Sequence, residues 1–101
     1  MIKISIKGNI DEITVKGHAN YDEFGKDIVC ASVSSILITS VNAIVRIDEE
    51  SIDYNELDGV YIKVLKHTDV IDKLLVNLVE LLSDLEKQYP KYPKYIEIRR
   101  C

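Results

Sequence analysis

The feature that most limits how this chain can fold is an uncharged run of 18 residues, from Ile28 to Val45. Six of the 18 are Ser, Thr or Asn, whereas a membrane-spanning helix needs about 20 predominantly apolar residues. We therefore expect a helix over residues 28–47 inside a globular protein, and no membrane span. Apolar residues make up 47% of the chain and charged residues 30%, which is an ordinary globular mixture. A length of 101 residues predicts one cysteine protease-sized domain, residues 1–101, with one core.

The predicted helix has two different faces. At about 100° per residue one stripe is apolar, and its members are Cys30, Val33, Leu37, Val41 and Ile44. The roughly opposite stripe is polar but uncharged, and its members are Ser32, Ser35, Thr39, Ser40 and Asn42. A helix face in free contact with water usually carries Lys and Glu. We expect the first stripe to pack in the core and the second to pack against another surface, such as a second subunit.

Alternating apolar and polar residues predict a hairpin before this helix. Residues 2–6 alternate, Gly8-Asn9 can supply the turn because both residue types tolerate positive φ, and residues 13–15 continue on a second strand. The periodicity is lost over residues 18–27. This segment therefore predicts a surface loop that ends at Asp27, a good N-cap for the helix.

A second hairpin and a second helix follow. Residues 51–66 form the hairpin around an Asp58-Gly59 turn, and Asp69 caps a helix over residues 70–89. Its expected core stripe consists of Leu74, Leu78, Leu81, Leu82 and Leu85. Residues 95–99 alternate again. The order β-β-α-β-β-α-β predicts an α+β fold with a mixed or antiparallel sheet of about five strands and two helices.

Cys30 is the first candidate for chemistry. If Asp27 is the N-cap, Cys30 is the third helical residue, where free backbone N–H groups and the helix dipole favour negative charge. A free thiol has a pKa of about 8.5, and a helix N-terminus with a cationic neighbour can lower it below 7.5. The position can therefore make a thiolate nucleophile without a metal ion.

His18 is the matching candidate base. It lies at the other end of the predicted loop, whose ends are a strand terminus and a helix start. A cysteine nucleophile needs a group that takes its proton and then protonates the leaving amine. Asp27 could orient His18, Ser34 could donate a hydrogen bond to the thiolate, and backbone N–H groups around Cys30 could form an oxyanion hole.

The same residues also have purely structural explanations. A free cysteine on an apolar helix face is commonly a core residue, and a histidine in a loop is commonly solvated. Asp27 can act only as a cap, and Ser34 can bond to its own helix. His18, Asp27 and Cys30 could supply three metal ligands, but no paired Cys or His spacing supports a metal site. We expect neither a metal ion nor a cofactor.

The string that contains these candidates resembles a known family. It reads Gly17-His18-Ala19, a short loop, and then Gly25-x-Asp27-Ile28-Val29-Cys30-Ala31-x-Val33-Ser34. This pattern is similar to that of the ribosomal-processing cysteine proteases, small bacterial proteins also described as ysxB-like. The specific signal is confined to residues 17–34, while element order and length agree over the whole chain. Ser32 departs from the pattern, in which Ala or Gly is more usual.

The resemblance implies an α+β cysteine endopeptidase, commonly a homodimer. By position, Cys30 is the nucleophile and His18 the general base and acid, and Gly17, Asp27 and Ser34 match supporting positions. The implied substrate is the precursor of the twenty-seventh protein of the large ribosomal subunit. The family removes an N-terminal extension from it, cutting after an aromatic residue.

Two further features suit such a substrate. Residues 48–58 contain six acids and no base, which could attract a basic protein: Asp48, Glu49, Glu50, Asp53, Glu56 and Asp58. Tyr21 and Phe24 lie in the predicted loop and could contact an aromatic substrate side chain, with Gly25 as a hinge. The alternatives are a solvated acidic hairpin and aromatic residues that anchor the loop on the core.

Charge and cysteine content limit the surroundings. There are 17 acids and 13 bases, a net charge of −4, so we expect no direct contact with nucleic acid. Two cysteines, one of them the terminal Cys101, form no disulfide framework, which predicts a cytoplasmic location. We expect His67 to be solvated. The rival functions are a non-enzymatic dimeric interaction module in ribosome assembly, and a metal or redox protein for which Cys101 would supply a second thiol.

Overall fold

The computed structural model describes residues 1–17, 24–56, 59–88 and 95–101, with residues 24–27 described for their backbone alone. Its elements are β1 (Ile2–Lys7), β2 (Glu12–Lys16), α1 (Phe24–Ile47), β3 (Ile52–Asn55), β4 (Val60–Val64), α2 (Asp69–Gln88) and β5 (Ile96–Arg100). The predicted order of strands and helices is confirmed.

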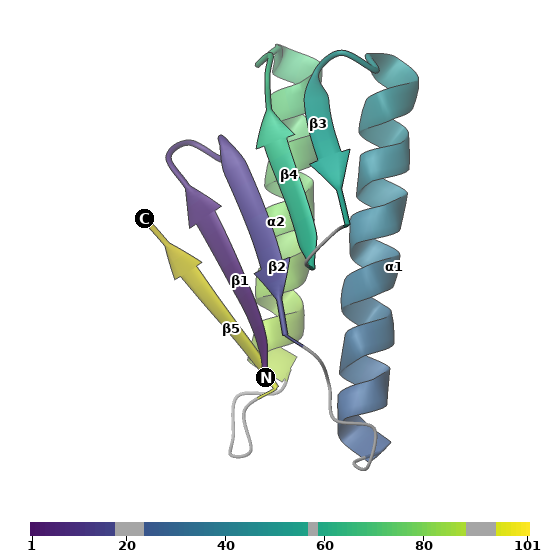
Figure 1. Ribbon diagram of the computed structural model, residues 1–101, viewed down its shortest axis with the longest axis vertical. Helices are drawn as coiled ribbons and strands as arrows, with labels where there is room; N and C mark the ends of the chain where they lie inside the picture. Colours follow the sequence, from purple (N-terminus) through teal and green to yellow (C-terminus); the bar gives the residue numbers. More distant parts are fainter. Residues whose placement is uncertain (18–23, 57–58, 89–94) are drawn as a thin grey trace.

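The five strands form one mixed sheet in the order β3-β4-β2-β1-β5 (Figure 1). The pairs β1–β2, β2–β4 and β3–β4 are antiparallel, and β5 pairs parallel with β1. The return of the chain through α2 explains the parallel pair, because parallel strands need a long crossover. The predicted α+β class is confirmed.

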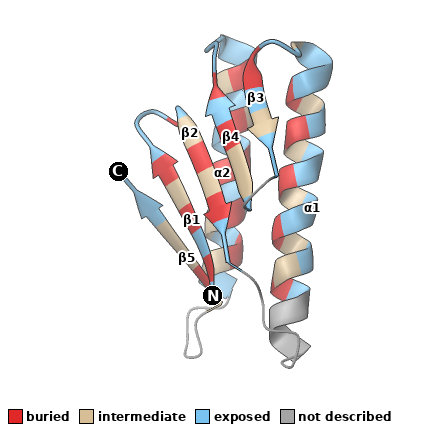
Figure 2. Ribbon diagram, viewed as in Figure 1, coloured by how far each residue is buried: buried red, intermediate tan, exposed pale blue. Residues whose placement is uncertain are grey.

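One face of the sheet and the inner faces of both helices make a single hydrophobic core (Figure 2). Along β1 the side chains of Ile2, Ile4 and Ile6 are buried, whereas Lys3 and Lys7 are exposed on the other face. This alternation follows from the period of two in a strand.

The apolar stripe of α1 packs as predicted. Val33, Leu37, Val41 and Ile44 are buried in the core, and Cys30 is half-buried against it. The stretch Ile28–Ile47 has a mean hydropathy of 2.1 and is long and apolar enough to cross a membrane, yet only 28% of the window is buried within the protein. The outer face of α1 is therefore uncharged and in large part uncovered.

The cap and the core stripe of α2 differ from the prediction in detail. The Oγ1 of Thr68 accepts a hydrogen bond from the N–H of Ile71 at 3.2 Å, so Thr68 is the N-cap and Asp69 is already helical. Leu81 is 41% exposed, so its place in the predicted core stripe was wrong. Ile71, Leu75 and Val79 join Leu78, Leu82 and Leu85 in the core instead.

The β1–β2 turn also differs from the prediction. Positive φ angles occur at Gly8 (61°) and Ile10 (57°), and not at Asn9. Ile10 is buried, so the burial of its side chain accompanies an unusual backbone conformation. The turn then leads to Asp11, whose carboxylate reaches another part of the chain.

Candidate active site

Cys30 lies in the second turn of α1. The helix begins at Phe24, so Cys30 is its seventh residue and lies about 9 Å along the axis from the start. The thiol is free and half-buried, and it packs beside the core. A partly accessible thiol on a rigid helix is a suitable position for a nucleophile.

The start of α1 corrects the prediction that Asp27 is its N-cap. Residues 24–27 are helical, so the helix extends one turn beyond the predicted boundary. Gly25 near a helix end costs little, and Lys26 and Asp27 have ordinary helix propensities, so the loss of apolar periodicity did not mean loss of helix. The four N–H groups that a helix leaves free are then those of residues 24–27. The backbone N–H groups around Cys30 are consequently a poor candidate for the oxyanion hole.

Gly17 ends β2 at the same end of the sheet at which α1 begins (Figure 1). Its φ is +104°, and a Cβ placed there would lie 2.2 Å from the carbonyl oxygen of Met1. Both the backbone conformation and the contact require glycine. Gly17 therefore fixes the direction in which the chain leaves the sheet toward His18.

The other residues of the predicted loop are only partly placed. His18 and Tyr21 lie outside the described residues. Phe24 and Gly25 were expected in the loop, but their backbone forms the first turn of α1. A hinge at Gly25 therefore has to operate within a helical turn.

Ser34 lies one turn along α1 from Cys30 and is exposed. The predicted bond from a serine to its own helix is made by another residue: Ser32 Oγ donates to the carbonyl of Ile28 at 2.9 Å. Within the described part of the chain Ser34 makes no such bond. Its hydroxyl is thus available to a group bound beside Cys30.

Cys101 is too far from Cys30 to act as a second thiol. Its N–H donates to the carbonyl of Ile6 at 2.9 Å, and its carbonyl accepts from Gly8 at 3.1 Å. These contacts hold Cys101 at the Lys7 end of β1, whereas Gly17 contacts Met1 at the other end. Six strand residues span about 20 Å, and a disulfide requires Cα atoms within about 7 Å. The redox alternative loses its second thiol.

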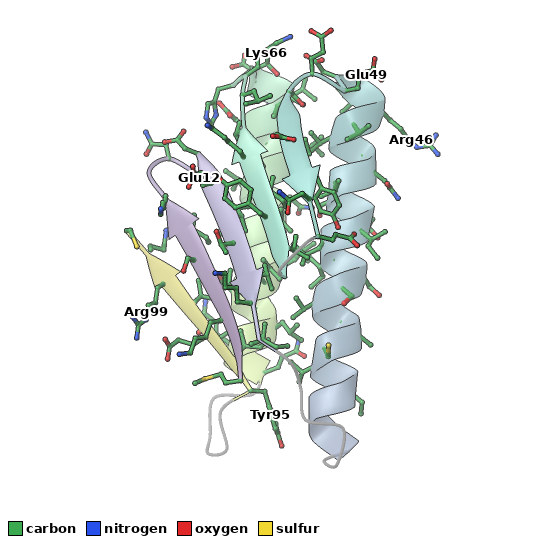
Figure 3. The ribbon with its side chains drawn as sticks, in the orientation of Figure 1. Glu12, Arg46, Glu49, Lys66, Tyr95 and Arg99 are labelled. Atoms are coloured by element: carbon green, nitrogen blue, oxygen red, sulfur yellow. The ribbon has the colours of Figure 1, made fainter. Side chains whose placement is uncertain are left out.

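The acidic segment does not form one surface near Cys30. Glu49 lies at the far end of α1, close to Lys66 (Figure 3). Asp48 and Cys30 are separated by about 27 Å along the helix. Asp48 is bonded to Lys66 Nζ at 2.9 Å, which lowers the pKa of its carboxyl group. Attraction of a basic substrate by the whole segment is therefore not supported.

Glu56 is the acid of this segment that is nearest to the Gly17 end among the described residues. Its Oε1 accepts a hydrogen bond from the hydroxyl of Tyr54. Burial and this bond raise the pKa of Tyr54 to about 12. Tyr54 packs partly into the core, as its assignment to sheet packing predicted.

His67 was expected to be solvated, and this was wrong. Its Nδ1 lies 2.6 Å from Asp72 and its Nε2 lies 2.8 Å from Asp11, so the imidazole joins the β1–β2 turn to the first turn of α2. The two carboxylates raise the pKa of His67. A sequence search could not find this cluster, because Asp11 and His67 are 56 positions apart.

Two hollows of about 300 Å³ lie on the surface. One lies between α1 and α2, and its lining is uncharged: Ser35, Ile36, Thr39, Ser40, Ala43, Leu74, Asn77 and Leu81. The other lies beside the β1–β2 turn and is lined by Asn9, Ile10, Asp72, Leu75, Val76 and Arg100. Cys30 lines neither. Among the described residues, no group of three or more His, Cys, Asp or Glu side chains could hold a metal ion.

Known proteins share both this fold and this sequence. The sequence profile of the cysteine protease Prp family matches residues 1–94. The ribosomal processing cysteine protease Prp of Staphylococcus aureus is 33% identical over 92 residues, which are 87% of each chain. The protein of that name from Mycoplasma genitalium is 34% identical over 98 residues, 97% of this chain and 94% of the relative.

A solved structure agrees over the full length. The S. aureus ribosomal processing protease, with a substrate peptide, superposes with a TM-score of 0.85 at 28% identity, and 100% of each chain is covered. In complex with a covalently linked product peptide, it superposes with a TM-score of 0.83, also at 28% identity and 100% of each chain. The fold and the sequence therefore define a cysteine protease. The chain belongs to the Prp family, and the predicted resemblance is confirmed.

Proposed function

We propose that this chain is a cytoplasmic endopeptidase that removes the N-terminal extension of the twenty-seventh protein of the large ribosomal subunit, cutting after an aromatic residue. The observation that carries the proposal is the free, half-buried Cys30 on a helix that begins at the end of the sheet where Gly17 directs the chain to His18. Its relatives are ribosomal processing proteases over nearly the same length, which supports the substrate class.

In the proposed reaction Cys30 is the nucleophile. His18 accepts the thiol proton, and the thiolate attacks the carbonyl carbon of the scissile peptide bond. The tetrahedral intermediate collapses when the imidazolium of His18 protonates the leaving amine, which frees the C-terminal product. Water, activated by His18, then hydrolyses the thioester and restores the thiol. The covalently linked product peptide in the S. aureus protease structure supports a covalent route.

Other groups support this dyad. Gly17 positions His18, and the exposed hydroxyl of Ser34 is available to the reacting carbonyl or thiolate. Asp27, no longer a cap, remains a candidate to orient His18 from the first turn of α1. Tyr21, Phe24 and Gly25 belong to the segment that meets the substrate's aromatic side chain.

The enzyme is proposed to work as a homodimer, without contact to membrane or nucleic acid. The uncharged outer face of α1 supports a second subunit. Val33, Leu37 and Ile44 hold the same helix against the sheet, so a membrane span would require α1 to leave its core. A net charge of −4 opposes binding to a phosphate backbone.

A cleavage assay tests the proposal. The extended ribosomal precursor is incubated with wild-type protein, Cys30→Ala, or Cys101→Ala as the matched control for the other free thiol. We expect one cut near the precursor's N-terminus with wild type and Cys101→Ala, and none with Cys30→Ala. Mass spectrometry identifies the residue before the cut.

The non-enzymatic interaction module remains the second candidate, because the outer face of α1 is uncharged and exposed. It predicts that folded wild-type protein leaves the precursor intact. It also predicts that Cys30→Ala supports growth as well as wild type does. The protease proposal fails on either result.

A further inference from the structure

The outer face of α1 carries a stripe of exposed residues with the spacing of a helix–helix contact. We call it the α1 seam, and it consists of Ile28, Ala31, Ser35, Ile38, Asn42 and Val45. The intervals are three and four residues in strict alternation, which is the spacing of a two-helix interface. Ile28, Ile38 and Val45 are 47%, 53% and 40% exposed, so apolar side chains recur along the seam over about 26 Å.

The hollow between α1 and α2 borders the seam. Ser35 belongs to the seam and also lines the hollow, and its neighbours there carry no charge. A protruding apolar side chain from another helix could enter it. The seam and the hollow together have the shape of a ridge beside a groove, which is how packed helices fit.

Charge favours a second copy of this chain as the occupant. Each copy has a net charge of −4, so two copies repel each other over most of their surface. Between Ile28 and Val45 there is no charged residue, so this face can meet its own copy without repulsion. An isologous interface requires a face that fits itself, and the seam does so.

The charges beyond the seam select an antiparallel arrangement. Asp48, Glu49 and Glu50 follow the C-terminal end of α1. Parallel seams would bring the acids of two copies together. Antiparallel seams place them beside the partner's helix N-terminus, whose dipole favours negative charge. Ser35 then lies opposite the partner's Ile38, and Ile28 lies opposite the partner's Val45.

We propose that two copies of this chain pair antiparallel through the α1 seam, and that the partner's helix thereby forms one wall of the cleft at Cys30. Ala31 follows Cys30 directly, and in this arrangement it lies opposite the partner's Asn42. The inference rests on the homodimer of the proposed function and adds its interface, its direction and its contact with the catalytic thiol. An uncharged wall would exclude water from one side of the thioester.

The oligomeric state tests the interface. Wild-type protein is expected to run as a dimer of 23 kDa, twice 11.5 kDa, in sedimentation at about 10 µM. Ile38→Glu is expected to run as a folded monomer. Val70→Glu is the matched control, because Val70 is equally exposed (51%) but lies on α2 outside the seam. A monomeric wild type, or a dimer that survives Ile38→Glu, overturns the proposal.

Cross-linking tests the direction. In a Cys30→Ser, Cys101→Ser background, a mixture of Ile28→Cys and Val45→Cys proteins should form a mixed disulfide dimer. Val45→Cys alone should not cross-link, because in the antiparallel arrangement its two copies are about 26 Å apart. Cross-linking of Val45→Cys alone would show parallel seams and contradict the proposal.

Two further readouts separate the seam from other possibilities. If the protease function holds, monomeric Ile38→Glu should lose at least tenfold in kcat/KM on the precursor, while Val70→Glu retains it. Full activity of the monomer would remove the composite wall and leave the protease intact. Sedimentation of monomeric wild type with phosphatidylcholine vesicles, lost in Ile38→Glu, would identify the seam as a lipid surface instead and overturn the proposal.

Discussion

The two ends of the sheet differ in how their chain segments are fixed. At the end that contains the β1–β2 turn, charged side chains join the segments: His67 bridges Asp11 and Asp72, and Lys66 binds Asp48. At the end that contains Cys30, the close contact is between two backbones, Gly17 against Met1. The difference suggests that one end holds the fold together and the other positions the chemistry.

The largest effect should come from the catalytic end. Cys30→Ser should lower kcat/KM by at least about 10³-fold, because a hydroxyl is a far weaker nucleophile than a thiolate. Its urea midpoint should stay close to that of wild type, since the two side chains have nearly the same size. A large drop in the midpoint would show that Cys30 is chiefly a core residue.

Two glycines sharpen the comparison. Gly17 and Gly59 both have positive φ, and a Cβ at either would lie within 2.3 Å of a backbone carbonyl oxygen, that of Met1 or of Val15. Ala at either position should destabilise the fold by about 1–3 kcal/mol through backbone strain. Only Gly17→Ala should also lower kcat at least tenfold with little change in KM, because it redirects His18. Equal kcat losses in the two variants would remove the positioning role of Gly17.

The cap of α2 gives a smaller effect at the other end. Thr68→Ala should destabilise the protein by about 1 kcal/mol, because the N–H of Ile71 loses its partner. Asp69→Ala should cost less, because Asp69 contributes only through the helix dipole. Thermal unfolding measures both, and cleavage by both should be unchanged. A larger loss in Asp69→Ala would restore Asp69 as the cap.

The His67 bridge should give the smallest effect, and one that depends on pH. The folded-state pKa of His67 is raised above its ordinary value of 6.5 by Asp72 and Asp11. The bridge therefore stabilises fully below about pH 6.5, and its contribution is lost as pH rises through the raised pKa. His67→Gln should be less stable than wild type by about 1 kcal/mol or less at pH 6, because solvent screens the pair.

Urea unfolding of wild type and His67→Gln from pH 6 to 9 measures this contribution. The gap in stability between the two proteins should narrow as pH rises, while their cleavage profiles against pH coincide. A gap that widens toward pH 9 would contradict the imidazolium bridge. A shifted cleavage profile would show that the two ends of the sheet are coupled.

Local pattern was enough to predict the elements and their class. Alternation in residues 2–6 buried Ile2, Ile4 and Ile6, and the 3.6-residue period of α1 buried Val33 and Leu37 as predicted. Both succeed because side-chain direction repeats along a regular element. The start of α1 was missed for the same reason, since polar residues in a first helical turn have no apolar period to detect.

Contacts between distant residues could not be predicted in this way. Thr68 became the cap because the chain enters α2 one residue earlier than expected, and Leu81 became exposed because α1 does not cover it. The acids of residues 48–58 appear continuous in sequence, yet the chain reverses after α1 and separates them. Their joint field on a substrate depended on a spatial arrangement that spacing does not encode.

The sequence by itself determined the element order, the buried faces and the family, because each follows from local periodicity or from the residues of one contiguous string. The tertiary structure alone decided that β5 pairs parallel with β1, that His67 meets Asp11, and that Gly17 rests on Met1. These contacts join segments far apart in the chain, and their partners are selected by the packing of the whole core and not by neighbours in sequence.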